Sequence, residues 1–130
     1  MKRKILVVDD EVDFIEVIKV RLESGGYDVV TSSNGEDALK KVRSEKPDAV
    51  LLDILMPGID GLEVLRRIRK IDEDLPVYII TAFSTEERFK VANKFGASGF
   101  IVKTDDLSKQ LDSVTSVLDM AARYRKNKQG

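Results

Sequence analysis

Four short apolar segments of the chain each lead into polar residues that are able to do chemistry. In chain order these are Asp9 and Asp10 after residues 5–8, Asp53 after residues 50–52, Thr81 after residues 77–80, and Lys103 after residues 100–102. If the four segments are parallel strands, their carboxyl ends meet at one edge of a sheet, where the sites of such folds lie. Carboxylates, a hydroxyl and an ammonium group would then converge, which is the composition of a metal-assisted phosphoryl-transfer site.

Neighbouring carboxylates repel one another at neutral pH unless a cation lies between them. Mg²⁺ is the natural cation here, with Mn²⁺ as an alternative, because both ions prefer carboxylate, carbonyl and water oxygens. One such divalent ion together with Lys103 would formally neutralise Asp9, Asp10 and Asp53. The hydroxyl of Thr81 adds a further group that can bind the oxygens of an arriving phosphoryl group.

Asp53 is the candidate phosphoryl acceptor, because no acidic residue adjoins it, whereas Asp9 and Asp10 form a pair suited to sharing a metal. Carboxylates act as phosphoryl acceptors, and phosphoryl transfer requires mainly positioning and neutralisation of charge. The chain contains no histidine, which excludes an imidazole base or phosphoryl carrier within it. Each residue alone has a simpler interpretation, such as a helix-capping aspartate or a solvated lysine, but their joint placement favours a site.

The elements that must position these residues alternate between strands and helices. The predicted strands are residues 5–8, 27–31, 49–53, 77–81 and 98–102. Segments with helical spacing of apolar residues follow each of them. This alternation predicts an α/β fold, a doubly wound parallel sheet with five strands and five helices in a three-layer sandwich.

Capping residues indicate where several of the helices begin. Asn34 is expected to cap a helix over residues 36–44. Ser84, with Glu87 three residues later, has the spacing of a capping box for the fourth helix. Residues 105–106 are expected to open the last helix.

Length and composition are those of one ordinary domain of 130 residues. The 22 basic and 23 acidic residues nearly balance, so nothing in the overall charge indicates nucleic-acid binding. The absence of cysteine excludes disulfides and thiolate zinc sites, and it fits a reducing, cytoplasmic location. No segment approaches the ~18 consecutive apolar residues of a membrane span. The apolar run near the N-terminus, residues 5–8, is too short for a signal peptide.

Four motifs carry a close resemblance to the receiver domain of two-component response regulators, over about residues 4–118. They are residues 7–11 (VVDDE), 51–61 (LLDILMPGIDG), 79–82 (IITA) and 96–103 (GASGFIVK). The resemblance implies a flavodoxin-like fold with strand order 2-1-3-4-5. It also implies a receiver domain over residues 1–122, with residues 123–130 as a basic tail or the start of a linker.

The resemblance implies a role for each residue of the acidic group. Asp53 would accept a phosphoryl group from a phosphohistidine on a sensor histidine kinase or a histidine phosphotransfer protein. Asp10, Asp53 and the backbone carbonyl of Leu55 would bind Mg²⁺, and Asp9 would contribute through a water molecule. Such a domain catalyses its own phosphorylation and dephosphorylation and is not a turnover enzyme.

The remaining site residues would bind the phosphoryl group and transmit its arrival. Thr81 and Lys103 would bind the phosphoryl oxygens. As Thr81 moves inward, Phe100 would rotate and change the face formed by the fourth helix, the fifth strand and the fifth helix. The expected partners are the phosphoryl donor and either a downstream protein or a C-terminal output domain outside this sequence. The expected state is a monomer or a phosphorylation-dependent dimer, without direct nucleic-acid or membrane binding.

The sequence departs from the family pattern in two places. Thr104 follows Lys103 where the family usually has proline after a cis bond, so a trans Lys103–Thr104 bond and a shifted loop are expected. Leu55 and Phe83 occupy positions near the phosphoryl group that are often polar in relatives. Apolar side chains there should shield the phosphoaspartate from water, so we expect slow self-dephosphorylation that Leu55→Asn accelerates.

Two alternatives use the same residues. A small metal-dependent phosphatase-like hydrolase also employs a strand-end aspartate, a divalent metal and a lysine, although no evident acid is present to protonate a leaving group. An inert receiver-like scaffold would only bind partners, and the intact set of candidate residues argues against it. A nucleotide-binding fold is disfavoured, because no glycine-rich phosphate loop follows the first strand.

Overall fold

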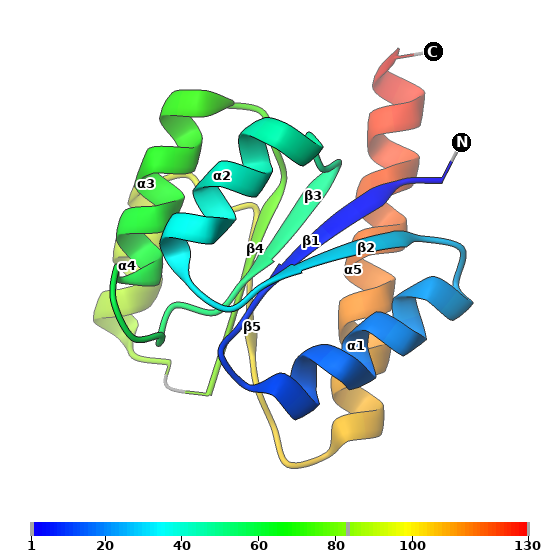
Figure 1. Cartoon of the computed structure of the whole chain (residues 1–130), viewed down its shortest axis with the longest axis horizontal. Helices are drawn as coiled ribbons and strands as arrows, with labels where there is room; N and C mark the ends of the chain where they lie inside the picture. The colour runs from blue at the N-terminus through cyan, green and yellow to red at the C-terminus, as the bar shows by residue number, and fades with distance from the viewer. Residues whose placement is uncertain (1, 83, 130) are drawn as a thin grey trace.

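The computed structural model describes residues 2–82 and 84–129, with side chains described as far as residue 123. Five parallel strands form one sheet in the order β2-β1-β3-β4-β5 (Figure 1). The strands are β1 (Lys4–Val8), β2 (Asp28–Ser32), β3 (Ala49–Leu52), β4 (Val77–Thr81) and β5 (Gly99–Val102). The predicted strand order and the predicted α/β class are therefore confirmed.

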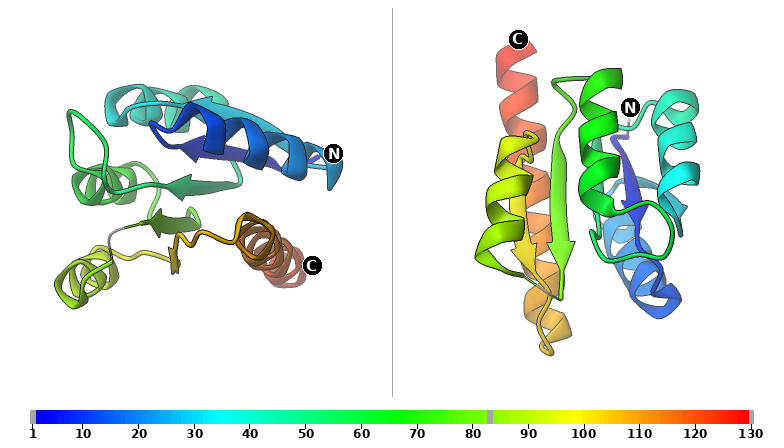
Figure 2. Two further views of the ribbon diagram at one scale, coloured as in Figure 1. Left: turned by 90° about the horizontal axis from the view of Figure 1, so that it is seen from below. Right: turned by 90° about the vertical axis from the view of Figure 1, so that its left-hand side faces the viewer.

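Helices cover both faces of the sheet and complete three layers. They are α1 (Val12–Ser24), α2 (Gly35–Glu45), α3 (Gly61–Ile71), α4 (Glu86–Lys94) and α5 (Leu107–Gln129). Helices α2, α3 and α4 lie on one face, and α1 and α5 lie on the other (Figures 1 and 2). Right-handed crossovers between parallel strands produce this division, because the chain winds in one direction from β1 to β2 and in the other from β3 to β5.

Alternate residues of the strands fill two separate cores, as the two-residue period of a strand requires. Leu6, Leu52 and Ile79 belong to the core beneath α2, α3 and α4. Ile5 and Leu51 belong to the core beneath α1 and α5. Because the central strands are buried on both faces, their sequences are nearly continuous apolar runs that only the strand ends interrupt.

The N-cap predicted from the sequence is correct for α2 but not for α4. The side chain of Asn34 accepts a hydrogen bond from the Asp37 N–H, as predicted. At α4 the prediction of Ser84 as N-cap was wrong, since Thr85 is the cap and its side chain accepts from the Arg88 N–H. Serine and threonine supply the same capping hydroxyl, and the extended backbone at Thr85 places the helix start one residue later.

The last helix is longer than the apolar pattern of the sequence suggested. Asp106 opens it as predicted, because its Oδ1 accepts a hydrogen bond from the Lys109 N–H. Helix α5 then continues to Gln129, so the basic segment from residue 123 is helical. Figure 1 shows this C-terminal part running past the sheet, near the N-terminal end of the chain. The domain boundary at residue 122 stays a prediction.

Candidate phosphoacceptor site

Three carboxylates gather at the carboxyl-terminal edge of the sheet. One carboxylate oxygen from each of Asp9, Asp10 and Asp53 lies within 4.8 Å of the other two. Asp9 and Asp53 are buried, whereas Asp10 is exposed. The structure thus brings together the acidic residues that the sequence placed at two separate strand ends.

The register of the central strands explains why these carboxylates meet. Strand β1 pairs with β3 so that Val8 lies opposite Leu52, and each is the residue before one of the two buried aspartates. The Asp53 N–H then continues the ladder by donating to the Val8 carbonyl at 2.9 Å. Adjacent parallel strands that end at the same level therefore deliver Asp9 and Asp53 side by side.

Close packing against α3 fixes the segment that carries Asp53. The side chain of Asp60 caps α3 by accepting from the Leu62 N–H, and the Gly61 N–H donates to the Ile54 carbonyl at 3.2 Å. A Cβ atom on Gly61 would lie 2.6 Å from the Asp53 carbonyl oxygen. Only glycine permits this approach, so Gly61 determines how the helix start meets the site.

Lys103 reaches into the acidic group from the end of β5. Its Nζ atom donates to Asp9 at 2.7 Å, to Glu11 at 3.0 Å and to Asp53 at 3.4 Å. The Nζ atom also lies 4.4 Å from the ring centroid of Phe14 on α1. Only 9% of the Lys103 side chain is exposed, so its charge is held inside the site and not in solvent.

The surroundings shift the pKa values of Asp53 and Lys103. Burial raises the pKa of the Asp53 carboxyl to about 6, with the charge of Asp9 acting in the same direction. The Leu55 N–H, which donates to Asp53 Oδ1 at 3.0 Å, and the charge of Lys103 oppose this rise. Burial alone would lower the pKa of Lys103. The hydrogen bond to Asp9 and the negative charge of Asp9 outweigh burial, and the other acidic neighbours of Lys103 add smaller effects, so the pKa of Lys103 is raised.

This balance of charge fits a divalent cation. Asp9, Asp10, Glu11 and Asp53 present four carboxyl groups to the site, against the single ammonium of Lys103. Carboxylate oxygens are the ligands that Mg²⁺ prefers, and Mg²⁺ commonly uses one or two of them. The donor set therefore suits Mg²⁺, and one ion would reduce the repulsion from Asp9 that adds to the effect of burial in raising the pKa of Asp53.

The other predicted residues lie around this centre. Thr81 is fully buried at the end of β4, and its carbonyl accepts the Lys103 N–H at 2.8 Å. Phe100 on β5 is half-buried and packs edge-on against Phe89 of α4, with ring centroids 5.5 Å apart. Leu55 follows Asp53 in the loop and is 36% exposed. The second predicted shielding residue, Phe83, lies outside the described residues.

The peptide bond after Lys103 has the conformation predicted from the presence of Thr104 in place of the usual proline. No cis peptide bond occurs in the described part of the chain, so the Lys103–Thr104 bond is trans as expected. The predicted shift of this loop relative to other members of the family stays a prediction.

Sequence reasoning gave no role to two residues that contact Lys103. Glu11 follows the two aspartates directly and supplies a third carboxylate partner for the ammonium. Phe14 lies three residues further along, one helical turn into α1. The position of Glu11 beside the acidic pair was an available signal, whereas the Phe14 contact depends on the tertiary placement of α1 relative to Lys103.

Comparison with known proteins identifies the family. Residues 5–115 match the family described as the response regulator receiver domain. The alkaline phosphatase synthesis transcriptional regulatory protein PhoP of Bacillus subtilis is 41% identical over 103 residues, which are 79% of this chain and 43% of that protein. The probable transcriptional regulator ycf27 of Guillardia theta is 42% identical over 78% of this chain and 40% of its own length. The chain thus spans about two-fifths of these relatives.

Solved structures give the same result. A CheY-like receiver domain protein from Methanospirillum hungatei superimposes with a TM-score of 0.85 at 25% identity, over 95% of this chain and 99% of that one. The response regulator TrrA of Thermotoga maritima, solved in complex with Mg²⁺ and beryllium fluoride, has a TM-score of 0.76 at 39% identity. That match covers 88% of this chain and 97% of TrrA.

Among the described residues, no helix combines the length and the apolar character needed to cross a membrane. The family match covers most of the chain, and the fold and acidic group agree with it. The chain therefore belongs to the receiver domains of two-component response regulators, a family whose role is phosphorylation-dependent signalling.

Proposed function

We propose that Asp53 is the phosphoacceptor of this receiver domain. The observation that carries the proposal is the burial of Asp53 beside Asp9, Asp10 and Lys103 at the end of the sheet. In the transfer, the N–P bond of a phosphohistidine on a sensor kinase or phosphotransfer protein breaks as an Asp53 oxygen bonds to phosphorus. The imidazole leaves with the electron pair of the broken bond.

Asp10, Asp53 and the Leu55 carbonyl would hold Mg²⁺, and Asp9 would contribute through water. When bound, the ion neutralises the negative charge that the phosphoryl group adds to the carboxylates. TrrA, whose structure contains Mg²⁺ with beryllium fluoride, supports this choice of cofactor. Lys103, now shared among three carboxylates, would turn toward a phosphoryl group, and Thr81 would donate its hydroxyl to it.

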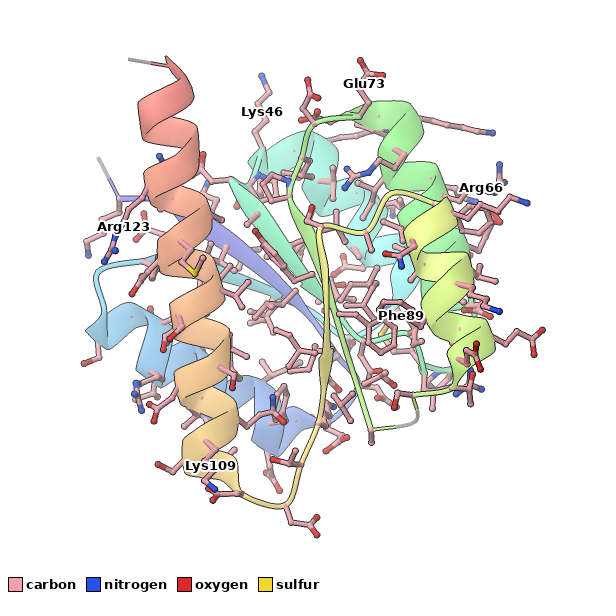
Figure 3. The ribbon with its side chains drawn as sticks, turned by 180° about the vertical axis from the view of Figure 1, so that it is seen from behind. Lys46, Arg66, Glu73, Phe89, Lys109 and Arg123 are labelled. Carbon is pink, nitrogen blue, oxygen red and sulfur yellow. The ribbon has the colours of Figure 1, made fainter. Side chains whose placement is uncertain are left out.

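The signal would leave the site through the face of α4, β5 and α5. A phosphoryl group carries about two negative charges and attracts Thr81 and Lys103 inward. Phe100, which contacts Phe89 at its edge, would then rotate into the space that Thr81 vacates. Figure 3 shows the labelled Phe89 side chain between α4 and β5. Phe89 is 46% exposed, and an exposed apolar residue on this face suits contact with a downstream protein, an output domain or a second copy.

The lifetime of the phosphoryl group is part of the proposal. The Leu55 side chain offers no polar group that could orient an attacking water, so self-dephosphorylation should be slow. Leu55→Asn should accelerate the release of phosphate from the phosphorylated protein several-fold. An unchanged release rate in Leu55→Asn would contradict the shielding role.

The test of the function is the mass of the intact protein after incubation with a small acyl-phosphate donor, with Mg²⁺ or with EDTA. We expect the gain of one phosphoryl group that requires Mg²⁺ and is absent in Asp53→Ala. Asp60→Asn, which removes an exposed charge seven residues away and keeps the oxygen that caps α3, should retain the gain and serves as the matched control. Continuous release of phosphate would indicate the hydrolase, and no reaction with the donor or with a kinase would indicate the scaffold.

A cytoplasmic location follows from the same proposal, because the phosphoryl donors of response regulators act there. The chain would then work beside its kinase without binding nucleic acid itself.

A further inference from the structure

The proposed mechanism leaves one buried polar side chain without a role. The buried polar or charged residues in the described part of the chain are Asp9, Ser32, Asp53, Thr81 and Gln110. Three of them belong to the site, and Ser32 bonds locally to the Asn34 carbonyl. Gln110, in the first turns of α5, is only 3% exposed. A buried amide is costly unless its hydrogen bonds are made, so its partner shows what it does.

Gln110 holds the backbone next to Lys103. Its Oε1 accepts a hydrogen bond from the Thr104 N–H at 2.7 Å. On the other side, the Lys103 N–H donates to the Thr81 carbonyl at 2.8 Å. The backbone around Lys103 is therefore tied to β4 before the residue and to α5 after it. In Figure 3 the labelled Lys109, the neighbour of Gln110, marks the turn of α5 beside the loop that leaves β5.

The side chain of Lys103 depends on such an anchor. Its four-carbon stem must cross from the end of β5 to bring Nζ within 2.7 Å of Asp9, and it does so with little exposure to solvent. A flexible stem holds its ammonium in place only if the backbone from which it starts is fixed. Errors of about 1 Å in such positions cost up to about 100-fold in rate.

We propose that Gln110 is a positioning residue that fixes the Lys103–Thr104 backbone and thereby holds the Lys103 ammonium at the acidic group. The inference rests on the proposed function, because Lys103 matters for phosphorylation only if Asp53 is the acceptor. It also makes the first turns of α5 a support for the site, in addition to their part in the signalling face.

The test compares two substitutions of nearly equal size. Gln110→Met removes the accepting oxygen, whereas Gln110→Glu retains one. We expect Gln110→Met to slow Mg²⁺-dependent phosphorylation by an acyl-phosphate donor about fivefold, in the range of one lost hydrogen bond. Mg²⁺ affinity should remain within about twofold, because Lys103 is not among the proposed ligands, and Gln110→Glu should recover most of the rate. Gln110→Leu replaces Gln110→Met if that variant does not fold.

Repeating the Gln110→Met measurement in a Lys103→Ala background separates a positioning role from a general loss of stability. If Gln110 acts through Lys103, Gln110→Met should have no further effect on the rate in Lys103→Ala. Thr104→Ala, which retains the N–H, should react like the wild type. Equal slowing in both backgrounds, a wild-type rate in Gln110→Met, or a parallel loss of Mg²⁺ affinity would overturn the proposal.

NMR of the Lys103 ammonium provides a readout without phosphorylation. Gln110→Met should shift or broaden this resonance in the metal-free protein, and Thr104→Ala, which retains the N–H that donates to Gln110, should leave it near its wild-type position. An unchanged resonance in Gln110→Met would overturn the positioning role. Failure of the wild type to take up a phosphoryl group, with the resonance shifted as expected, would contradict the proposed function and leave the anchoring intact.

Discussion

Asp53 should destabilise the metal-free protein in which it is ionised. Asp53 is 4% exposed and lies beside Asp9, so both burial and charge repulsion disfavour its ionised form. Asp53→Asn removes the charge while its side-chain oxygen can still accept the Leu55 N–H. Lys103 loses only the longest of its three carboxylate contacts. We therefore expect Asp53→Asn to be more stable than the wild type when Mg²⁺ is absent.

The magnitude follows from the pKa of Asp53. In the unfolded chain this carboxyl titrates near its ordinary pKa of 3.8, and in the folded chain it titrates at about 6. Between these values the folded state binds more protons, so the free energy of unfolding falls as pH rises through this window. A tenfold change in proton affinity is worth about 1.4 kcal/mol, so the loss approaches about 3 kcal/mol above pH 6.

Urea unfolding in EDTA at several pH values between 4 and 8 measures this difference. We expect Asp53→Asn to exceed the wild type by up to about 3 kcal/mol at pH 7.5, with the gap closing toward pH 4. Saturating Mg²⁺ should stabilise the wild type more than Asp53→Asn. Asp60→Asn, at an exposed helix cap, should change stability by less than about 0.5 kcal/mol. A wild type as stable as Asp53→Asn at pH 7.5, or a gap that widens toward pH 4, would refute the reasoning.

Three further substitutions test local features by urea unfolding. Gly61→Ala should cost about 3 kcal/mol and weaken Mg²⁺ binding, because the new Cβ would force the Asp53 carbonyl to move. Lys46→Gly should stabilise the protein by about 0.5–1 kcal/mol, since Lys46 ends α2 with a left-handed φ of 48°. Burial, and then the hydrogen bond to Asp119, raise the pKa of Tyr27 above its ordinary 10.0. The folded state therefore retains a proton that the unfolded state loses, so wild-type stability should fall as pH rises beyond 10, with a smaller fall in Tyr27→Phe.

Each of these has a matched control. Gly26→Ala adds the same methyl group in open space and should cost only about 1 kcal/mol from its positive φ, so an equal loss in Gly61→Ala would contradict the steric argument. Lys40→Gly, inside α2, should destabilise by about 1 kcal/mol, and the same sign for Lys46→Gly would count against the left-handed cap. Equal alkaline slopes for Tyr27→Phe and the wild type would show that Tyr27 does not cause the effect.

Much of the site could be predicted because it depends on a general property of parallel sheets. Asp53, Thr81 and Lys103 are far apart in sequence, but each follows a strand, and parallel strands end at one edge. The two-sided burial of β1 and β3 makes those strands nearly continuous apolar runs, so their ends are visible in the sequence. The juxtaposition of Asp9 with Asp53 follows from the same pattern, whereas the strand order is predicted by the resemblance to the receiver family.

The features that sequence reasoning missed depend on details that periodicity does not encode. Ser84 and Thr85 are both good helix caps, and the backbone conformation decides between them. Glu11 acquires its role only because Lys103, 92 residues later, ends within 3.0 Å of it. Gln110 resembles an ordinary polar residue of a surface helix in the sequence, and only its burial against Thr104 shows that it supports the site.

The most direct test of the proposed acceptor is to locate the phosphoryl group. Borohydride reduces an aspartyl phosphate to homoserine, so peptide mass spectrometry of the phosphorylated, reduced protein identifies the modified position. We expect homoserine at position 53 alone, dependent on Mg²⁺, with Asp9 and Asp10 unchanged. Homoserine at position 9 or 10, or a phosphorylated protein with Asp53 intact, would contradict the assignment of Asp53 as the phosphoacceptor.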